Sequence, residues 1–290
     1  MAARARRVTA PLRATSRHLV KNRHLPAAFV SSWRLGRSHQ GVFAGVQTYC
    51  MFVGYPRSGH SLVGSLLDAH PDAVIAHELD ALRYVRAGFS RDQVFALILD
   101  KDREFSRQGR QAKVDYTYVV PGQWQGRYRE LVVIGDKKGG HSTAALAGHP
   151  PLLDRLRSRV GVPLRLVHVT RNPYDNIATI FTRSPKADLG AAVEHYLSLR
   201  RGMEGIRRRL APGELLDLRY ESLLEDPAPQ LERLCAFAGL EVPPDYTSAC
   251  AAVLRPPRPT RHQAPWTSDL RRRVDREVAA GADLSGYAFE

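Results

Sequence analysis

The sequence has few cysteines and no long apolar run, and each shortage excludes a class of protein. Only three of its 290 residues are cysteine, without a Cys-x-x-Cys pair, so neither a disulfide framework nor a zinc site is indicated. The most apolar stretch, residues 49–55, is far shorter than the roughly 18 residues that a membrane helix needs. The N-terminus also lacks the apolar segment of a secretory signal. We therefore expect a cytoplasmic chain without a transmembrane segment.

Acidic residues are absent from the first 67 positions, where ten Lys and Arg residues occur. The whole chain has 43 Lys and Arg against 29 Asp and Glu, a formal net charge of +14, so most of the excess lies at this one end. Because residues 1–45 also show no sustained apolar period, we expect a basic, partly flexible arm there, with at most short helical pieces. An Arg-, Ala- and Ser-rich composition without acidic residues is also typical of organelle transit peptides.

From residue 46 onwards, short apolar runs alternate with helical periods. Buried strands are expected at 47–54, 131–135, 164–169 and 215–218, and helices at 60–70, 80–107 with a break near 88–90, 173–183, 189–210, 227–239 and 268–279. Strands that alternate with helices predict a parallel sheet with helices on both faces. We therefore expect a single α/β domain, a three-layer sandwich, over residues 46–290.

The strongest motif lies where the first of these strands ends. The segment GYPRSGHS at 54–61 has the frame of a phosphate-binding loop, G-x-x-x-x-G-K-[ST], with His60 in the lysine position. Backbone N–H groups at the start of the following helix, together with its dipole, attract anions whatever the side chains are. Arg57 supplies a cation inside the loop. The motif predicts a P-loop NTPase-like sandwich and an anion site at Arg57, Ser58, Gly59, His60 and Ser61.

The same loop resembles the P-[KR]-[ST]-G-[TS]-[TS] loop of sulfotransferases, which in that family binds the 5′-phosphosulfate of 3′-phosphoadenosine 5′-phosphosulfate (PAPS). Residues 167–179 (VHVTRNPYDNIAT) resemble the family's strand–loop–helix that holds the 3′-phosphate of the donor. There an Arg that ends the strand and a hydroxyl residue eight positions later share this phosphate, and the matching residues are Arg171 and Thr179. Residues 218–227 and 284–289 agree as well. The resemblance to P-loop sulfotransferases thus covers residues 47–290.

The resemblance also implies a catalytic base. Residues 69–78 (AHPDAVIAHE) look like the segment that delivers a catalytic glutamate in the tyrosylprotein and related carbohydrate branches of the family. Aligned on the His-Pro-Asp at 70–72, that glutamate falls on Glu78. His77 is the alternative, because other branches use a histidine. Either group beside an acceptor hydroxyl can take its proton.

The segment DKKGG at 136–140 resembles the family's [ED]-K-[ST]-P step, whose lysine stabilises charge on the bridging oxygen as the sulfuryl group departs. Lys137 takes that position. Because Lys138 and a glycine stand where the family has Ser/Thr-Pro, the choice between the two lysines stays open.

Near the C-terminus, Arg261 is a candidate ligand of the 3′-phosphate, although the family's R-K-G-x-x-G pattern is absent. No metal is required by this scheme.

The resemblance implies in-line transfer of a sulfuryl group from PAPS to a hydroxyl, less readily an amine, of a small molecule, glycan or lipid, with adenosine 3′,5′-bisphosphate as the product. One alternative is a P-loop kinase that uses ATP and Mg²⁺, with 132–136 as a strand ending in a metal-binding carboxylate. Another is a non-enzymatic binder of anionic polymers through the basic arm. Because neither aromatic interleaving nor a nucleic-acid-binding fold is recognised, no nucleic-acid partner is expected.

Overall fold

A five-stranded sheet forms the centre of the molecule in the computed structural model, which describes residues 25–111, 117–184, 188–256 and 258–290. The strand order is β2-β3-β1-β4-β5, and every neighbouring pair is parallel. The strands are β1 (Thr48–Gly54), β2 (Ala73–His77), β3 (Val133–Lys137), β4 (Leu164–Thr170) and β5 (Leu215–Arg219). The predicted parallel α/β architecture is therefore confirmed.

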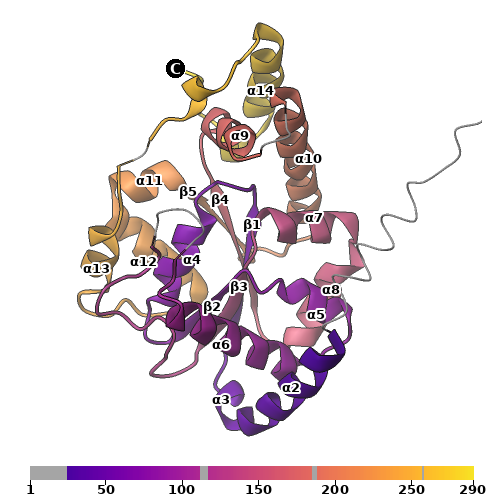
Figure 1. The fold of residues 1–290 in the computed structure, drawn as a ribbon, viewed down its shortest axis with the longest axis vertical. Helices are drawn as coiled ribbons and strands as arrows, with labels where there is room; N and C mark the ends of the chain where they lie inside the picture. The colour runs from indigo at the N-terminus through magenta and orange to yellow at the C-terminus, as the bar shows by residue number, and fades with distance from the viewer. Residues whose placement is uncertain (1–24, 112–116, 185–187, 257) are drawn as a thin grey trace, which may run out of the picture.

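Helices cover both faces of this sheet (Figure 1). One face carries α5 (Ala81–Arg86), α6 (Arg91–Arg107), α7 (Gly140–Gly148) and α8 (Pro151–Val160), and the other carries α4 (His60–Asp68), α11 (Tyr220–Glu225), α12 (Pro227–Ala238) and α13 (Tyr246–Ala252). Because successive side chains of a strand point to opposite faces, Met51 of β1 joins the first core and Phe52 the second. In the described part of the chain, no helix is long and apolar enough to cross a membrane.

A third apolar cluster lies beyond the phosphate-binding loop. It joins α9 (Pro173–Thr182), α10 (Leu189–Arg207) and α14 (Ser268–Ala280) around the buried rings of Tyr55 and Tyr196, whose centroids are 4.4 Å apart. These helices form the upper end of the molecule in Figure 1. The short helices η1 (Arg261–Gln263) and η2 (Ala282–Leu284) hold the C-terminal chain against this end. The loop that follows β1 is thereby fixed between the sheet and the third cluster.

The second half of the expected N-terminal arm is helical and packed. Residues 1–24 lie outside the described residues, but α2 (Leu25–Ser38) and α3 (Gln40–Ala44) lie against α6 at the lower end of Figure 1. Phe43 is buried, with its ring centroid 5.6 Å from that of Phe95. Gln93 of α6 donates to the carbonyl of Phe29 at 2.9 Å. Residues 25–44 of the expected arm thus pack on α6 through tertiary contacts.

Two further expectations differ from the structure. The strand expected at 131–135 lies at Val133–Lys137, so that Asp136 and Lys137 are strand residues and both are buried. The stretch after it, for which no helix was expected, contains α7 and α8, of which α8 is closed by Gly161 in the left-handed conformation. The shift of β3 matters for the site, because it brings Asp136 and Lys137 into the sheet beside β1 and β2.

Candidate functional site

A cavity of about 960 Å³ opens at the carboxyl ends of the strands, where parallel α/β sheets place their ligand sites. Eight of the expected site residues line it: Arg57, Gly59, His60, Ser61, His77, Glu78, Arg171 and Thr179. Ser58, Lys137 and Arg261 were expected with them but do not line it. Lys138, the alternative to Lys137, lines it instead. The structure therefore brings both halves of the expected site, after β1 and after β4, into one cavity.

The phosphate-binding loop joins β1 to α4 in a conformation that depends on glycine. Gly59 has φ = 96°, and a Cβ placed on it would clash with the ring of Tyr220. Ser58 is buried, and its Oγ donates to the carbonyl of Tyr55 at 2.9 Å, so this side chain holds the loop rather than facing the cavity. The first N–H groups of α4 have no partner within the helix. The loop thus fits an anionic group at the floor of the cavity.

His60 occupies the lysine position of the loop as a neutral group. Its Nδ1 lies 3.1 Å from Ser58 Oγ, and its ring packs on Gly139, where an added Cβ would clash with it. Burial, and then the positive charge of Lys137, lower the pKa of His60 to about 3. The loop therefore carries no charge at this position.

Lys137 brings the missing cation to the loop from the neighbouring strand. Its Nζ donates to Ser61 Oγ at 2.7 Å and to Glu78 Oε1 at 3.1 Å, and its side chain is 1% exposed. Gly64 of α4 makes room for it, since a Cβ there would lie 3.0 Å from Lys137 Cγ. Burial lowers the pKa of Lys137 to about 8, although the charge of Glu78 opposes this shift. The cation is thus held at the loop rather than free in the cavity.

Glu78 lies between the two lysines of β3 and its following turn. Its Oε2 is 3.3 Å from Lys138 Nζ, in addition to the Lys137 contact. Partial burial alone would raise the pKa of Glu78, but the charges of Lys137 and Lys138 outweigh it and lower the pKa to about 2. The carboxylate is therefore ionised and exposed to the cavity. The Glu78 carboxylate does not cap α5, because that helix begins at Ala81 and its N-cap residue is Asp80.

Asp136 holds the turn that presents Glu78. Its Oδ1 accepts from the N–H of Leu79 at 3.0 Å and its Oδ2 from the N–H of Ala81 at 2.7 Å. The N–H of Glu78 donates to the carbonyl of Lys137 at 2.9 Å, so three hydrogen bonds fix this turn to β3. Glu78 itself has φ = 62°, a left-handed conformation that such anchoring can maintain. Asp136 is buried and does not line the cavity, so it is not placed as the metal ligand of the kinase alternative.

His77, the other candidate base, is part of an aromatic wall. Its ring stacks on Phe105 with centroids 4.3 Å apart and an interplanar angle of 15°, and Tyr118 lies 5.4 Å away. Burial, followed by the charge of Lys137, lowers the pKa of His77 to about 3. The imidazole is therefore neutral at physiological pH. His77 and Glu78 both face the cavity, so both stay candidates on position alone.

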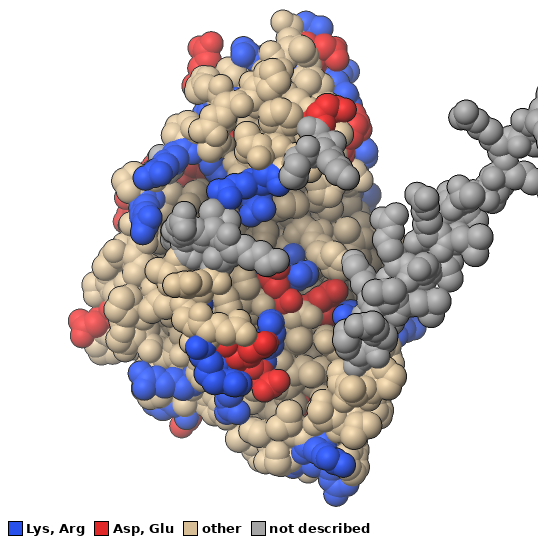
Figure 2. Space-filling model, viewed as in Figure 1, with Lys and Arg blue, Asp and Glu red and all other residues tan. Residues whose placement is uncertain are grey.

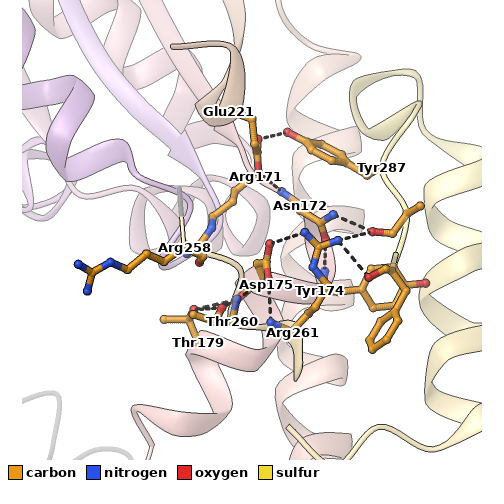
Figure 3. A network of polar contacts seen from close by, with 12 residues as sticks. Arg171, Asn172, Tyr174, Asp175, Thr179, Glu221, Arg258, Thr260, Arg261 and Tyr287 are labelled. Atoms are coloured by element: carbon orange, nitrogen blue, oxygen red, sulfur yellow. Dashed lines mark hydrogen bonds and ion pairs between the residues drawn. The ribbon is translucent and has the colours of Figure 1, made fainter. Parts of the chain in front are cut away.

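Arg171 lines the cavity directly after β4. Its Nη2 donates to the carbonyl of Arg258 at 3.1 Å (Figure 3). Its Nη1 donates to the carbonyl of Arg57 at 3.4 Å, and its guanidinium lies 5.8 Å from the centroid of the Tyr220 ring. Thr179 is two turns along α9, and its Oγ1 donates to the carbonyl of Asp175 at 2.7 Å. Arg171 therefore bridges the phosphate-binding loop and the C-terminal loop from one position.

Arg261 is engaged elsewhere. Its guanidinium pairs with Asp175 at 3.2 Å and donates to the carbonyls of Ala288 at 2.9 Å and Phe289 at 3.1 Å. Asp175 also accepts from the N–H groups of Thr260 and Arg261 (Figure 3). Arg261 borders a second, smaller cavity of about 130 Å³, which Arg171 also reaches. Arg261, the candidate ligand of the 3′-phosphate, thus does not line the main cavity, because Asp175 and the C-terminal chain hold its guanidinium.

Several lining residues were not expected. Tyr220 covers Gly59 on one side and borders the cavity. Its position directly after β5, at the same edge of the sheet as Arg171, is the signal that could have identified it. Lys101 and Phe105 of α6 line the opposite wall, and no motif marks them in the sequence. Near the centre of the face in Figure 2, basic and acidic side chains lie side by side.

Comparison with known proteins gives one sequence match and several similar structures. Residues 164–244, from β4 through α12, match the model of a family described as "Sulfotransferase family". No curated protein matches the sequence. Similar solved structures include sulfotransferase STF9 from Mycobacterium avium (13% identity, 87% of this chain and 81% of that chain covered, TM-score 0.49). The sulfotransferase domain of the Synechococcus PCC 7002 olefin synthase is 18% identical, with 70% and 76% covered and a TM-score of 0.45. Mouse sulfotransferase SULT7A1, complexed with PAP, is 12% identical, with 85% and 88% covered and a TM-score of 0.45.

The family match falls on the segment whose motif carries Arg171 and Thr179. The structure places that segment beside the phosphate-binding loop, within a five-stranded parallel sheet flanked by helices. Over residues 164–244 the chain is therefore similar to the sulfotransferase family.

Proposed function

We propose that this protein transfers the sulfuryl group of PAPS to a hydroxyl acceptor. The observation that carries the proposal is that one cavity is lined by a phosphate-binding loop, by an arginine after the neighbouring strand β4, and by an ionised carboxylate after β2. PAPS carries anionic groups at two separated positions, and the two cationic ends of this cavity fit that pattern. The family match and the PAP in the mouse relative agree with the same donor.

The residues present fit the donor at both ends. N–H groups of the loop and the Arg57 side chain would hold its 5′-phosphosulfate, and Lys137 adds charge through its position at Ser61. Arg171 and Thr179 would hold the 3′-phosphate, for which a planar guanidinium is well suited. Bound PAPS supplies an activated sulfuryl group, and its loss leaves adenosine 3′,5′-bisphosphate. The cavity brings these groups together, so positioning contributes much of the expected rate.

Glu78 is the proposed base. Its carboxylate is ionised and faces the cavity, so it can accept the proton of an acceptor hydroxyl as the new oxygen–sulfur bond forms. Lys137 and Lys138 stand on either side of it, and either ammonium can stabilise the negative charge that develops on the departing phosphate oxygen. We assign this role to Lys137. Lys138, which lines the cavity, is the alternative.

The test is an acceptor screen read by mass spectrometry. The full chain is incubated with PAPS and a panel of hydroxyl compounds that includes phenols, sugars and lipid alcohols. The expected result is the gain of one SO₃ group by an acceptor, with an equal amount of adenosine 3′,5′-bisphosphate, and no such product with Glu78→Gln. Phosphorylation of the same panel with ATP and Mg²⁺, without any sulfated product from PAPS, would contradict the proposal.

A further inference from the structure

Helix α2 packs against the protein in reverse of an ordinary amphipathic helix. A surface helix normally buries its large apolar residues and exposes its polar ones. In α2 the buried residues are Ser32 and Gly36. Phe29, Val30, Trp33 and Leu35 are 37–53% exposed, and they are four of the six large hydrophobic side chains that the described residues expose. Apart from Leu25, which packs against the first core, the large apolar side chains of this helix are therefore substantially exposed.

Specific contacts hold α2 in this orientation. Gln93 of α6 donates from Nε2 to the carbonyl of Phe29 at 2.9 Å and to Ser32 Oγ at 3.3 Å. Gly36 approaches the start of α6 so closely that a Cβ there would lie 3.1 Å from the backbone of Asp92. Small residues are thus needed on the inner side. The outward position of the apolar residues follows from this packing.

Three of the exposed residues share one arc of the helix. Trp33 follows Phe29 by four residues, about one turn, and Val30 lies about 60° from Trp33 around the axis, given 100° per residue. Phe29 keeps one edge on Phe89, with ring centroids 5.1 Å apart, and the Arg37 guanidinium lies 5.0 Å from the Trp33 ring. This arrangement gives an aromatic and aliphatic strip along the outer side of α2.

Within α2, only basic charges accompany this strip. Arg34 and Arg37 lie beside it, the helix contains no Asp or Glu, and none occurs in the sequence before Asp68. The lowest part of the molecule in Figure 2, where α2 lies in Figure 1, shows basic and uncharged side chains without an acidic one in view. Aromatic residues flanked by arginines, on a helix too short and too polar to span a bilayer, are the combination that binds the interface of anionic membranes.

We propose that the α2 face formed by Phe29, Val30, Trp33, Arg34 and Arg37 docks the protein onto anionic lipid bilayers. The apolar side chains enter the headgroup region and the two arginines contact acidic headgroups. The inference is independent of the proposed reaction, and none of these residues lines the main cavity, so docking leaves the cavity lining unchanged. It also gives a role to Arg34 and Arg37 of the acid-free basic stretch, which the proposed donor site does not use.

Vesicle flotation of the full chain tests this surface. Vesicles of phosphatidylcholine alone are compared with vesicles that also contain phosphatidylserine, at low and at physiological salt. We expect binding to the anionic vesicles, weaker by about tenfold or more on neutral ones and reduced by salt. Phe29→Ser with Trp33→Ser, and separately Arg34→Glu with Arg37→Glu, should each reduce binding by about tenfold or more. Val242→Ser, which removes a 38%-exposed apolar residue elsewhere, should bind like the unmodified protein.

Three results would overturn the inference. The first is equal binding to neutral and anionic vesicles, or none to either. The second is anionic binding that the Phe29/Trp33 double variant keeps and that soluble heparin matches, which would reduce it to polyanion binding. The third is a dimer without lipid that the double variant abolishes, which would assign the face to a second copy of the chain. Circular dichroism and thermal unfolding of each variant verify that the fold is kept, as expected for exposed side chains.

Discussion

Lys137 joins the phosphate-binding loop to the proposed base: its Nζ lies 2.7 Å from Ser61 Oγ and 3.1 Å from Glu78 Oε1. The ammonium is almost completely buried, so it interacts with both groups with little screening by water. Any change in its charge acts on the anion site and on the base together.

Replacing Glu78 by Gln should abolish most of the turnover while donor binding is kept. The amide keeps the size of the side chain but cannot accept the acceptor's proton, and general base catalysis typically contributes roughly 10²–10⁴-fold. Turnover with PAPS and calorimetric affinity for adenosine 3′,5′-bisphosphate are the two measurements. His77→Asn is the matched control, since His77 also faces the cavity. A larger loss of turnover in His77→Asn than in Glu78→Gln would move the base to the histidine.

The donor kcat/KM should fall as the pH rises above about 8. The pKa of Lys137 is lowered to about 8, so its charge is present below that pH and is lost above it. Loss of the charge weakens the anion site and the stabilisation of the leaving oxygen. In Lys137→Arg the guanidinium stays charged, so this alkaline decline should disappear even if the rate is lower. An unchanged alkaline decline in Lys137→Arg would assign the titration to another group.

Asp136→Asn should reduce turnover through the position of Glu78. One of the two N–H groups, of Leu79 or Ala81, would face an amide NH₂ instead of an acceptor, at a cost of about 1–3 kcal/mol in the free energy of unfolding. We expect kcat to fall at least about tenfold, with affinity for adenosine 3′,5′-bisphosphate kept.

The control for this prediction is Asp68→Asn. Asp68 is also buried, and its Oδ1 accepts from the N–H of Ile75 at 2.7 Å, but it does not touch the Glu78 turn. Urea unfolding should show a loss of stability in both variants, and only Asp136→Asn should lose kcat in the folded protein. Equal kcat losses in the two variants would mean that Asp136 acts through general stability alone.

Arg171→Ala should weaken binding of adenosine 3′,5′-bisphosphate by roughly 10–100-fold, the range for a lost hydrogen bond to a charged group. Binding of adenosine 5′-phosphosulfate, which lacks the 3′-phosphate, should change little. Arg261→Ala serves as the comparison: because its guanidinium is held by Asp175 and two carbonyls, it should lower stability with a smaller effect on this discrimination. The reverse order of the two variants would return the 3′-phosphate to Arg261.

Much of the frame of this site was predictable because its signals are local. The apolar runs of β1 and β4 predict buried strands, and the glycine loop and Arg171 directly follow them. Parallel strands place such loops at one edge of a sheet, so the order of motifs along the chain is enough to predict that they meet. The strand that carries Lys137 was placed two residues early, since charged residues were not expected inside a strand.

The remaining parts depend on partners far away in the sequence. Lys137 can be buried because Ser61 and Glu78 receive its ammonium, and Arg261 is withdrawn from the main cavity because Asp175, 86 positions earlier, pairs with it. The packing of helix α2 was not expected, because its fully buried residues are Ser32 and Gly36 rather than the apolar period of a core helix. Sequence patterns report the conformation that a segment favours by itself, whereas these three features depend on contacts between segments that are distant in the sequence.

Calorimetry of the full chain with adenosine 3′,5′-bisphosphate and with ATP, each with and without Mg²⁺, tests the central claim most directly. The proposed donor site predicts that adenosine 3′,5′-bisphosphate binds without Mg²⁺ and with higher affinity than ATP. Arg171→Ala should lower this affinity. Tight Mg²⁺-dependent binding of ATP, with none of the bisphosphate, would contradict it.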